Sequence, residues 1–300
     1  NTPFSDIFRK YIVGAGPKGN YGLEYQLKAL KEHALTGAFF VEPLFSTCYG
    51  CQPLEEIVGQ IQEKRQEVQL HLHTEWVDES SKPLIHNVAK KRQHLFLFNL
   101  EEQKQLISNG LKLLHKAGAV TINAFRAGSF GFNRDTLRAL NGTNIRFDSS
   151  YNATMFGPAS GVMPNTTAVE PFECEGIVEY PMSVFKDGTG ALRHAQLSAC
   201  SSTEMENLLW QALENDRNTF VILSHNFELL NTSKTRPDHV MLKRFNKLCS
   251  FLDRNRDSFR TCGFKGLTPK TVIKQPPPLT MAFWPTANRV VEQIGRRVFL

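Results

Sequence analysis

The sequence has few cysteines and no long apolar run. Six cysteines in 300 residues are too few for a secreted scaffold held by disulfides. No hydrophobic stretch reaches the length of a membrane span, and the first residues lack the pattern of a signal peptide, so the sequence favours a cytoplasmic location. The chain opens without Met, as a fragment or a processed form does. Cys48 and Cys51 form a CxxC pair without the second pair of a zinc ribbon, and we interpret them as a structural loop pair, with redox or metal use as the alternative.

The chain also lacks a concentrated excess of charge along its main body. The net charge is +6, and much of it falls late: five basic residues from Lys270 onward stand against one acid, Glu292. The rest is nearly balanced, which argues against a nucleic-acid groove. A hydrophobic content of 41% in 300 residues is enough for one large core or two small ones.

Helix-like and strand-like segments alternate along most of the chain without a detectable repeat. Apolar periodicity predicts helices over residues 23–34, 54–61, 107–114, 133–140, 203–215 and 241–252, and strands over 38–41, 68–72, 119–125, 145–147, 177–185, 220–223 and 259–264. Such alternation predicts an α/β fold with a mainly parallel sheet. At this length a distorted (β/α) barrel of about seven strands is favoured over an open sheet.

Two histidines and a glutamate fall within five residues in the stretch that begins at Val68. Apolar and polar residues alternate from Val68 to His73, the period-2 pattern of a strand, so His71 and His73 should project from the same face while the strand continues. With the carboxylate of Glu75 just beyond, these imidazoles could form a metal site with open positions. The alternative is a pair of hydrogen-bonded histidines at a strand end.

Other polar residues occupy the same position relative to their predicted strands. Arg126, Asp148 and His225 lie at or just past the carboxyl ends of three further strands. In βα barrels the loops converge at this rim, and sites are built there. The sequence therefore predicts one functional site that combines these residues with the histidine motif.

Four ordered motifs resemble those of the polysaccharide deacetylase family of metal-dependent carbohydrate de-N-acetylases. They are LHLHTEW (Leu70–Trp76), FRAGSFGFN (Phe125–Asn133), FDSSYN (Phe147–Asn152) and LSHNFELL (Leu223–Leu230). The resemblance covers residues 20 to 265. It implies a glycan or polysaccharide substrate whose N-acetyl groups are removed by hydrolysis.

Two departures from the family pattern concern the metal and the base. Family members carry an acidic pair at the end of the first barrel strand, and here no such strand precedes the first helix, so the first strand is expected to lie upstream or to have been lost. Asp6 and Glu42 could substitute for the pair, but neither has the family's context. The family also spaces its metal-binding histidines four apart, whereas the position four after His71 is Glu75. Which of His73 and Glu75 completes the metal sphere stays open.

The resemblance implies a role for each matched residue. A divalent metal, zinc in the first instance, would be held by His71 with at least one of His73 and Glu75, and it would activate a water molecule. His225 would protonate the departing amine, Asp148 would hold the imidazolium of His225, and Arg126 would pair with the base carboxylate. Ser129, Phe130 and Trp76 would contact the substrate.

The segment after residue 270 is predicted to be separate from the barrel domain of residues 1–270. Three prolines from Pro276 precede a basic stretch in which Val290, Ile294 and Val298 repeat every four residues, among Arg289, Arg296 and Arg297. This tail could lie on an anionic membrane surface, pack back on the barrel, or pair with a second copy.

Two further functions remain open from the sequence. The chain could be a saccharide-binding relative that has lost its base, or a metal amidohydrolase that acts on a small amide.

Overall fold

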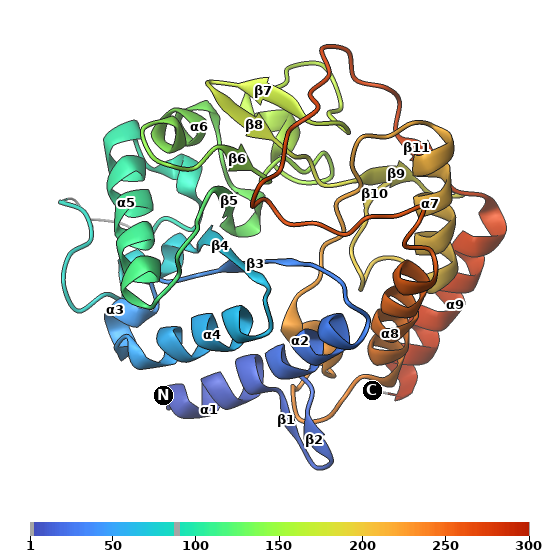
Figure 1. Cartoon of the computed structure of the whole chain (residues 1–300), viewed down its shortest axis with the longest axis horizontal. Coiled ribbons are helices and arrows are strands. Elements are labelled where there is room, and N and C mark those ends of the chain that lie inside the picture. Colours follow the sequence, from blue (N-terminus) through green and yellow to red (C-terminus); the bar gives the residue numbers. More distant parts are fainter. Residues whose placement is uncertain (1–2, 87–90, 300) are drawn as a thin grey trace. The chain divides into compact units, whose positions relative to one another are not determined.

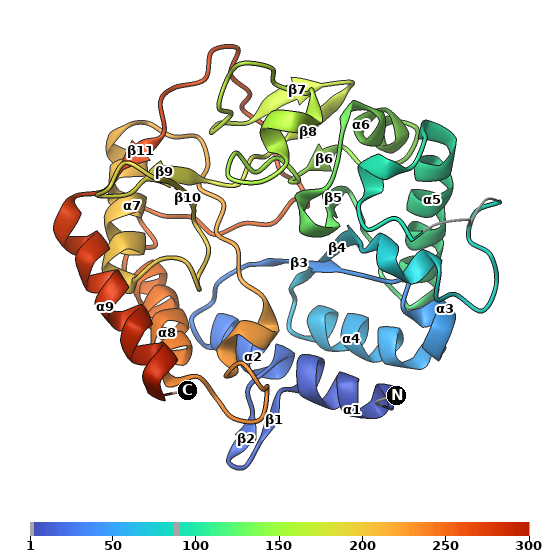
Figure 2. The ribbon, with the colours of Figure 1, turned by 180° about the vertical axis from the view of Figure 1, so that it is seen from behind.

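A computed structural model describes residues 3–86 and 91–299 (Figures 1 and 2). By its internal contacts the chain divides into two compact units, each of which is described by itself. Unit one comprises Asn1–Thr36, Ser183–Thr261 and Pro278–Leu300, and unit two comprises Gly37–Met182 and Cys262–Pro277. The predicted boundary near residue 270 stays a prediction.

Unit two contains a six-stranded sheet. Its strands are β3 (Ala38–Val41), β4 (Glu67–Leu72), β5 (Ala124–Ala127), β6 (Phe147–Asp148), β8 (Ile177–Glu179) and β7 (Phe172–Cys174), in that spatial order. All neighbours pair in parallel except β7, which is antiparallel to β8. The carboxyl ends of five strands therefore meet at one edge, where His71 is the register partner of Arg126, and Asp148 that of Glu179.

The predicted α/β class with a mostly parallel sheet is confirmed, but the closed barrel is not found. Among the described residues the six strands have a linear order with two ends, β3 and β7. The predicted strand 177–185 is interrupted, because Pro181 has no N–H to give to a ladder, and its second part is β9 (Val184–Lys186) of unit one.

Two other predicted strands are wrong. The apolar run 220–223 makes a single bridge, from Leu223 to Gln196, because the chain enters a turn directly after Gln196 and offers no further strand to pair with. The run 259–264 forms no strand, and the N–H of Phe264 donates instead to the carboxylate of Glu67.

Four helices of unit two flank the sheet: α3 (Ser46–Tyr49), α4 (Gln52–Glu63), α5 (Leu100–Lys116) and α6 (Arg134–Asn141). A capping box between Asn99 and Glu102 fixes the start of α5. The absence of a side chain at Gly110 lets α5 seat closely on β4: a Cβ there would lie 2.9 Å from side-chain atoms of both Leu70 and Leu72. This contact holds the strand that carries the histidine motif.

Unit one is built from helices around a three-stranded sheet, β10 (Leu192–His194), β9 and β11 (Leu279–Thr280). Its helices are α1 (Phe4–Phe8), α2 (Leu23–Glu32), α7 (Ser202–Glu214), α8 (His239–Arg254) and α9 (Phe283–Phe299), with a small hairpin of β1 (Ala15–Gly16) and β2 (Gly19–Asn20). Buried side chains of α7 and α8 supply much of its core, among them Leu208 and Phe251.

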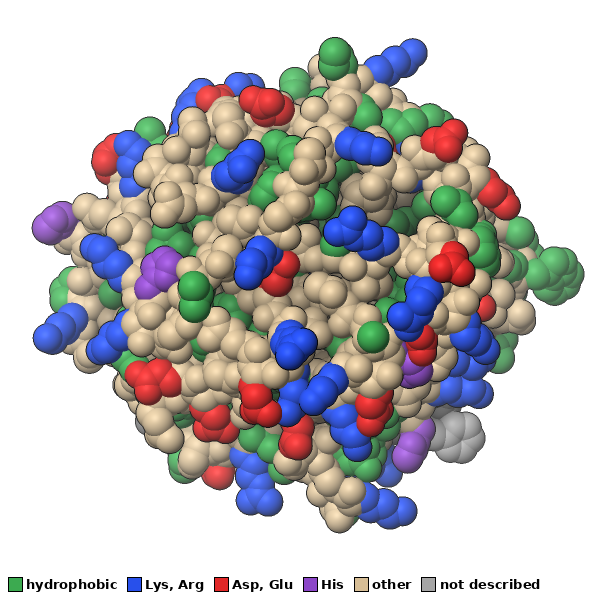
Figure 3. Space-filling view, viewed as in Figure 1, with side chains coloured by type: hydrophobic (Ala, Val, Ile, Leu, Met, Phe, Trp, Pro, Cys, Tyr) green, Lys and Arg blue, Asp and Glu red, His purple; other side chains and the backbone are tan. Residues whose placement is uncertain are grey.

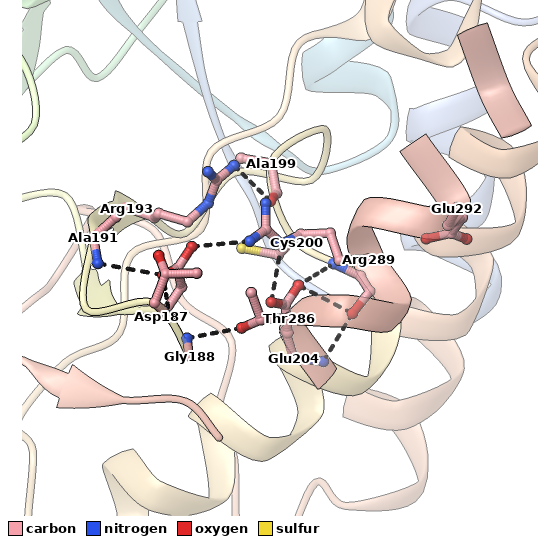
Figure 4. A network of polar contacts seen from close by, with 12 residues as sticks. Asp187, Gly188, Ala191, Arg193, Ala199, Cys200, Glu204, Thr286, Arg289 and Glu292 are labelled. Atoms are coloured by element: carbon pink, nitrogen blue, oxygen red, sulfur yellow. Dashed lines mark hydrogen bonds and ion pairs between the residues drawn. The ribbon is translucent and has the colours of Figure 1, made fainter. Parts of the chain in front are cut away.

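The C-terminal tail is helical and attached to unit one by a buried arginine (Figure 4). Arg289 donates to Asp187 and to Glu204, both at 3.0 Å, and all three side chains are at most 5% exposed. The predicted basic face of the tail is thus partly turned inward, while Val291 and Ile294 are exposed. Leu300 lies outside the described residues. Contact of the tail with a membrane surface stays a prediction, and in the described part of the chain no helix is long and apolar enough to cross a membrane.

Candidate active site

The histidine motif lies at the carboxyl end of β4 in unit two. His71 is inside the strand and His73 follows its last residue, and their rings are in edge-to-face contact with centroids 4.8 Å apart. The Nδ1–H of His71 donates to the carbonyl of Arg126 at 2.6 Å. A neutral ring with its proton on Nδ1 carries its lone pair on Nε2, the atom with which such a ring binds a metal.

Two glutamates lie beside His73. Oε2 of Glu75 is 3.3 Å from Nδ1 of His73, so this carboxylate is placed to orient the ring. Glu42 directly follows β3 and is half-buried, and its carboxylate accepts the N–H groups of Leu44 and Phe45 at 2.8 and 3.1 Å. Burial raises the pKa of Glu42 to about 8, with a smaller rise from Glu75, while backbone hydrogen bonds, one of them from His73, lower it. The neighbouring strand end thus brings Glu42, one of the two acids considered as substitutes, to the histidine motif.

The donor types suit zinc, but the set is incomplete in number. Imidazole and carboxylate groups, such as those of His71, His73, Glu42 and Glu75, are among the ligands that zinc binds in proteins. A zinc site usually contains three or four protein ligands. Among residues 3–86 and 91–299, no group of three or more histidine, cysteine or acidic side chains is arranged to hold a metal ion. The structure therefore provides a histidine pair with its orienting partners, and zinc itself stays a prediction.

Arg126 is buried at the end of β5. Its guanidinium donates to the carbonyl and to the hydroxyl of Ser149, at 2.9 and 2.8 Å, and lies over the ring of Phe40 at 4.4 Å. Burial lowers the pKa of Arg126 to about 10, and the charges of Asp148 and Glu179 oppose that change. Arg126 therefore interacts with Asp148 and Glu179 through charge, and its predicted pairing with the base carboxylate stays a prediction.

Asp148 and Glu179 form a fully buried acid pair at the adjacent ends of β6 and β8. Oδ1 of Asp148 accepts the hydroxyl of Ser150 at 2.6 Å, and Oε1 of Glu179 accepts the N–H of Tyr151 at 2.9 Å. The other oxygen of each has no hydrogen-bond partner among the described residues while both acids are ionised. Burial raises the pKa of both, that of Glu179 further because of Asp148, so a proton shared between the two carboxyl groups would relieve their repulsion. Asp148 has no contact with solvent and can act only through its neighbours.

The loop after β5 contains two predicted substrate contacts in a strained backbone. Ser129 and Phe130 have φ values of 52° and 59°, in the left-handed region that non-glycine residues rarely adopt. Gly128 before them is needed for close approach, since a Cβ there would lie 2.6 Å from the carbonyl of Leu72 and 3.0 Å from the ring of His73. The loop is therefore held directly against the histidine motif.

Trp76, the third predicted substrate contact, is half-buried in the 3₁₀ turn Thr74–Val77. It packs edge-on against Phe45 and against Tyr49, whose ring centroid is 5.9 Å away and whose surface is exposed. Tyr49 adds a second aromatic side chain that the sequence interpretation did not include. Nearby, the Cys48 thiol donates to the carbonyl of Glu79 at 3.1 Å, and both Cys48 and Cys51 are free.

His225 belongs to unit one, where its carboxylate partner is Glu228. Nδ1 of His225 and Oε1 of Glu228 are 3.1 Å apart, across the 3₁₀ turn Asn226–Leu229. The predicted pairing of His225 with Asp148, a residue of unit two, stays a prediction. Glu228 and Glu179 are the acids that the sequence interpretation missed. Their signals were present, because Glu228 follows His225 by three residues and Glu179 ends a strand as Asp148 does.

Surface charge shows no continuous basic groove on the face displayed in Figure 3, where Lys and Arg are interspersed with Asp and Glu. This distribution agrees with the balanced composition of the body of the chain.

Comparisons with known proteins find solved structures of similar fold but no matching sequence family. No protein-family model and no curated protein matches the chain. Its structure is similar to a candidate polysaccharide deacetylase from Mycobacterium smegmatis (18% identity, TM-score 0.47, 86% of this chain and 82% of that one). It is also similar to a family 4 carbohydrate esterase from Streptomyces lividans in complex with acetate (15%, 0.43, 84% and 90%) and to a family 4 pseudoenzyme from Bacillus anthracis (12%, 0.43, 84% and 63%).

In fold, the chain is thus similar to polysaccharide deacetylases and family 4 carbohydrate esterases, in agreement with the resemblance predicted from its four motifs. Identities of 18% or less and TM-scores below 0.5 carry nothing about its chemistry.

Proposed function

We propose that this chain hydrolyses N-acetyl groups on a glycan. The observation that carries the proposal is the convergence of four side chains at the carboxyl ends of β3 and β4: the imidazoles of His71 and His73, with the carboxylates of Glu42 and Glu75 beside them. Imidazole and carboxylate groups at neighbouring strand ends suit the hydrolysis of an amide, which needs proton transfer and stabilisation of an oxyanion.

A divalent metal is part of this proposal. His71 and His73 would hold it, each with Nδ1 engaged by a neighbour, and Glu75 would orient His73. When bound, zinc would polarise the acetamide carbonyl and lower the pKa of a bound water molecule.

Other side chains would transfer protons, stabilise charge and contact the sugar. Glu42 would accept one proton from the water molecule that adds to the acetamide carbon. The C–N bond then breaks with its electron pair on nitrogen, and the protonated ring of His225 gives that nitrogen a proton, so that an amine and acetic acid, which ionises to acetate, leave. Arg126 keeps positive charge at the strand ends and, held by Ser149, supports the ionised form of a nearby carboxylate. Trp76 and Tyr49 offer rings on which a sugar could stack.

The test is acetate release from a soluble oligomer of N-acetylglucosamine with added zinc. We expect release by the wild type, a loss of roughly 10²–10⁴ in kcat for His225→Ala with unchanged metal content, and loss of both metal and activity for His71→Ala. Substitution of the exposed Glu173 by Gln is the matched control in unit two. A wild type that releases no acetate at any zinc concentration would contradict the proposal.

Saccharide binding without hydrolysis is the second candidate. It is favoured by the lack of a three-residue metal group in the described parts of the chain. Calorimetry with the same oligomer separates the two functions, because a binding protein would take up the oligomer without releasing acetate.

A further inference from the structure

We propose that Glu228 is the positioning residue of His225, a role that rests on the proposed function of His225 as the proton donor. The carboxylate lies 3.1 Å from Nδ1 of His225, so the N–H on that nitrogen points at Glu228. The proton that is given to the departing amine must then come from the opposite nitrogen, Nε2. Glu228 would therefore decide which nitrogen of His225 faces the substrate.

The carboxylate of Glu228 is itself held from several sides. Its Oε1 accepts from the amide of Gln196 and from the hydroxyl of Ser198, the latter at 3.0 Å, and its Oε2 lies 3.4 Å from the backbone N–H of His225. The side chain is only 10% exposed. A carboxylate with this many fixed donors cannot follow a moving imidazole, so the imidazole must conform to it.

The direction of the Gln196 amide is also determined. Its oxygen accepts from Nε2 of His194 at 2.6 Å, which turns the NH₂ group toward Glu228. The chain of hydrogen bonds from His194 through Gln196 thus ends on the Glu228 carboxylate, which also lies 3.1 Å from Nδ1 of His225.

The ring of His225 is fixed in plane as well as in direction. It stacks on Phe227 with centroids 5.0 Å apart and planes inclined by 19°. Both Phe227 and Glu228 come from the same short turn, Asn226–Leu229, which folds back on the histidine. The two side chains described as fixing the ring, Phe227 and Glu228, are therefore only two and three residues away in the sequence.

Electrostatics keep Glu228 ionised for this role. Burial alone would raise the pKa of Glu228, but the hydrogen bonds and charge of His225, with Gln196 and Ser198, outweigh burial and hold the pKa below its ordinary value. An ionised carboxylate stabilises the protonated ring before transfer. Afterwards it keeps the remaining proton on Nδ1, because that N–H is its hydrogen-bond donor.

The experiment compares Glu228→Gln, Glu228→Ala and Glu228→Asp in the full chain, with the exposed Glu214→Gln of α7 as the control. Gln keeps an acceptor at Nδ1 without the charge, whereas Ala removes both, and Asp keeps the charge at shorter reach. Nitrogen-15 NMR of labelled histidine reports which ring nitrogen of His225 carries the proton, and acetate release gives kcat and KM.

We expect the neutral ring to carry its proton on Nδ1 in the wild type and in Glu228→Gln, and on Nε2 in Glu228→Ala. The value of kcat should fall about 10-fold in Glu228→Gln and about 100-fold in Glu228→Ala with KM unchanged, by analogy with the carboxylates that orient metal-bound histidines. Glu228→Asp should recover part of the loss, and Glu214→Gln should match the wild type.

Two results would overturn the inference. One is a proton that stays on Nδ1 in Glu228→Ala, and the other is a Glu228→Ala protein with wild-type kcat although the wild type is active. If the wild type itself releases no acetate, the proposed function fails while the NMR comparison still decides whether Glu228 sets the ring. The unfolding midpoint of each variant separates either result from misfolding.

Discussion

The buried pair of Asp148 and Glu179 allows a sharp prediction about stability and pH. We compare Glu179→Gln with Glu179→Ala. Gln keeps an oxygen that accepts the N–H of Tyr151, and its NH₂ group can donate to Oδ2 of Asp148 in place of the shared proton. Ala removes both interactions inside a region that is fully buried.

The magnitudes follow from what each change leaves without a partner. In Glu179→Ala the N–H of Tyr151 loses its acceptor, which costs roughly 1–3 kcal/mol for a buried donor. Truncation of the buried side chain adds roughly 1–2 kcal/mol of lost packing. We therefore expect Glu179→Ala to lower the free energy of unfolding by about 3 kcal/mol, and Glu179→Gln to stay within about 1 kcal/mol of the wild type.

The pH dependence has a definite sign. The pKa values of both acids are raised in the folded chain, so the folded protein binds the shared proton more tightly than the unfolded one. This contribution to stability is complete below the ordinary carboxyl pKa and is lost as the pH rises toward the folded-state pKa, by up to about 1.4 kcal/mol per pH unit for one proton. Glu179→Gln removes one of the titrating groups and should flatten the decline.

Urea denaturation from pH 4 to 9, followed by tryptophan fluorescence and circular dichroism, measures these differences. Glu173→Gln serves as the control, since Glu173 is exposed on β7, next to the same strand β8. Two results would refute a shared proton in this pair. One is a Glu179→Gln protein that is as unstable as Glu179→Ala. The other is a wild type whose free energy of unfolding does not decline as the pH rises and follows the same pH dependence as that of Glu179→Gln.

Three other outcomes are expected. Arg289→Ala should lower the free energy of unfolding by about 3–5 kcal/mol, because it leaves Asp187 and Glu204 buried without their cation; Arg289→Met with Asp187→Asn should recover part of this loss in urea denaturation. The pKa of Asp187 is lowered, because hydrogen bonds from Thr189 and the charge of Arg289 outweigh its burial. The contribution of Asp187 to the free energy of unfolding should therefore be present above the ordinary Asp pKa and be lost as the pH falls through the pKa of the folded state. Acid denaturation of the wild type and of Asp187→Asn measures this difference. His71→Ala should bind less zinc than the wild type by calorimetry and elemental analysis, and equal metal content would remove His71 from the site.

The strands that carry the histidine motif could be predicted because local and long-range signals agree there. Residues 38–41 form β3 and the alternating run from Val68 lies in β4, each preceded by a helix with a clear apolar face. The prediction of polar residues at strand ends also holds for Arg126 and Asp148. Periodicity suffices when an apolar segment has a partner strand beside it.

Periodicity fails where the partner is a side chain. The backbone of residues 264 and 265 bonds to the carboxylate of Glu67, about 200 positions earlier in the chain, so the segment satisfies its N–H groups without a strand. The acid pair was missed for a related reason: the register of β6 and β8 places Asp148 beside Glu179, and no local pattern encodes which strands are neighbours.

The three histidines of the motifs share one hydrogen-bonding arrangement at Nδ1, and the sequence indicates it for two of them. In each, Nδ1 is directed at an oxygen: the carbonyl of Arg126 for His71, Glu75 for His73 and Glu228 for His225. Two of these partners are glutamates only two and three residues downstream, close enough for a single turn to bring the carboxylate back to the ring. An N–H fixed on Nδ1 places the lone pair or the second proton on Nε2. A glutamate two or three residues after a histidine is therefore a signal for the direction of the ring. Here it predicts that metal binding by His73 and proton donation by His225 both use Nε2.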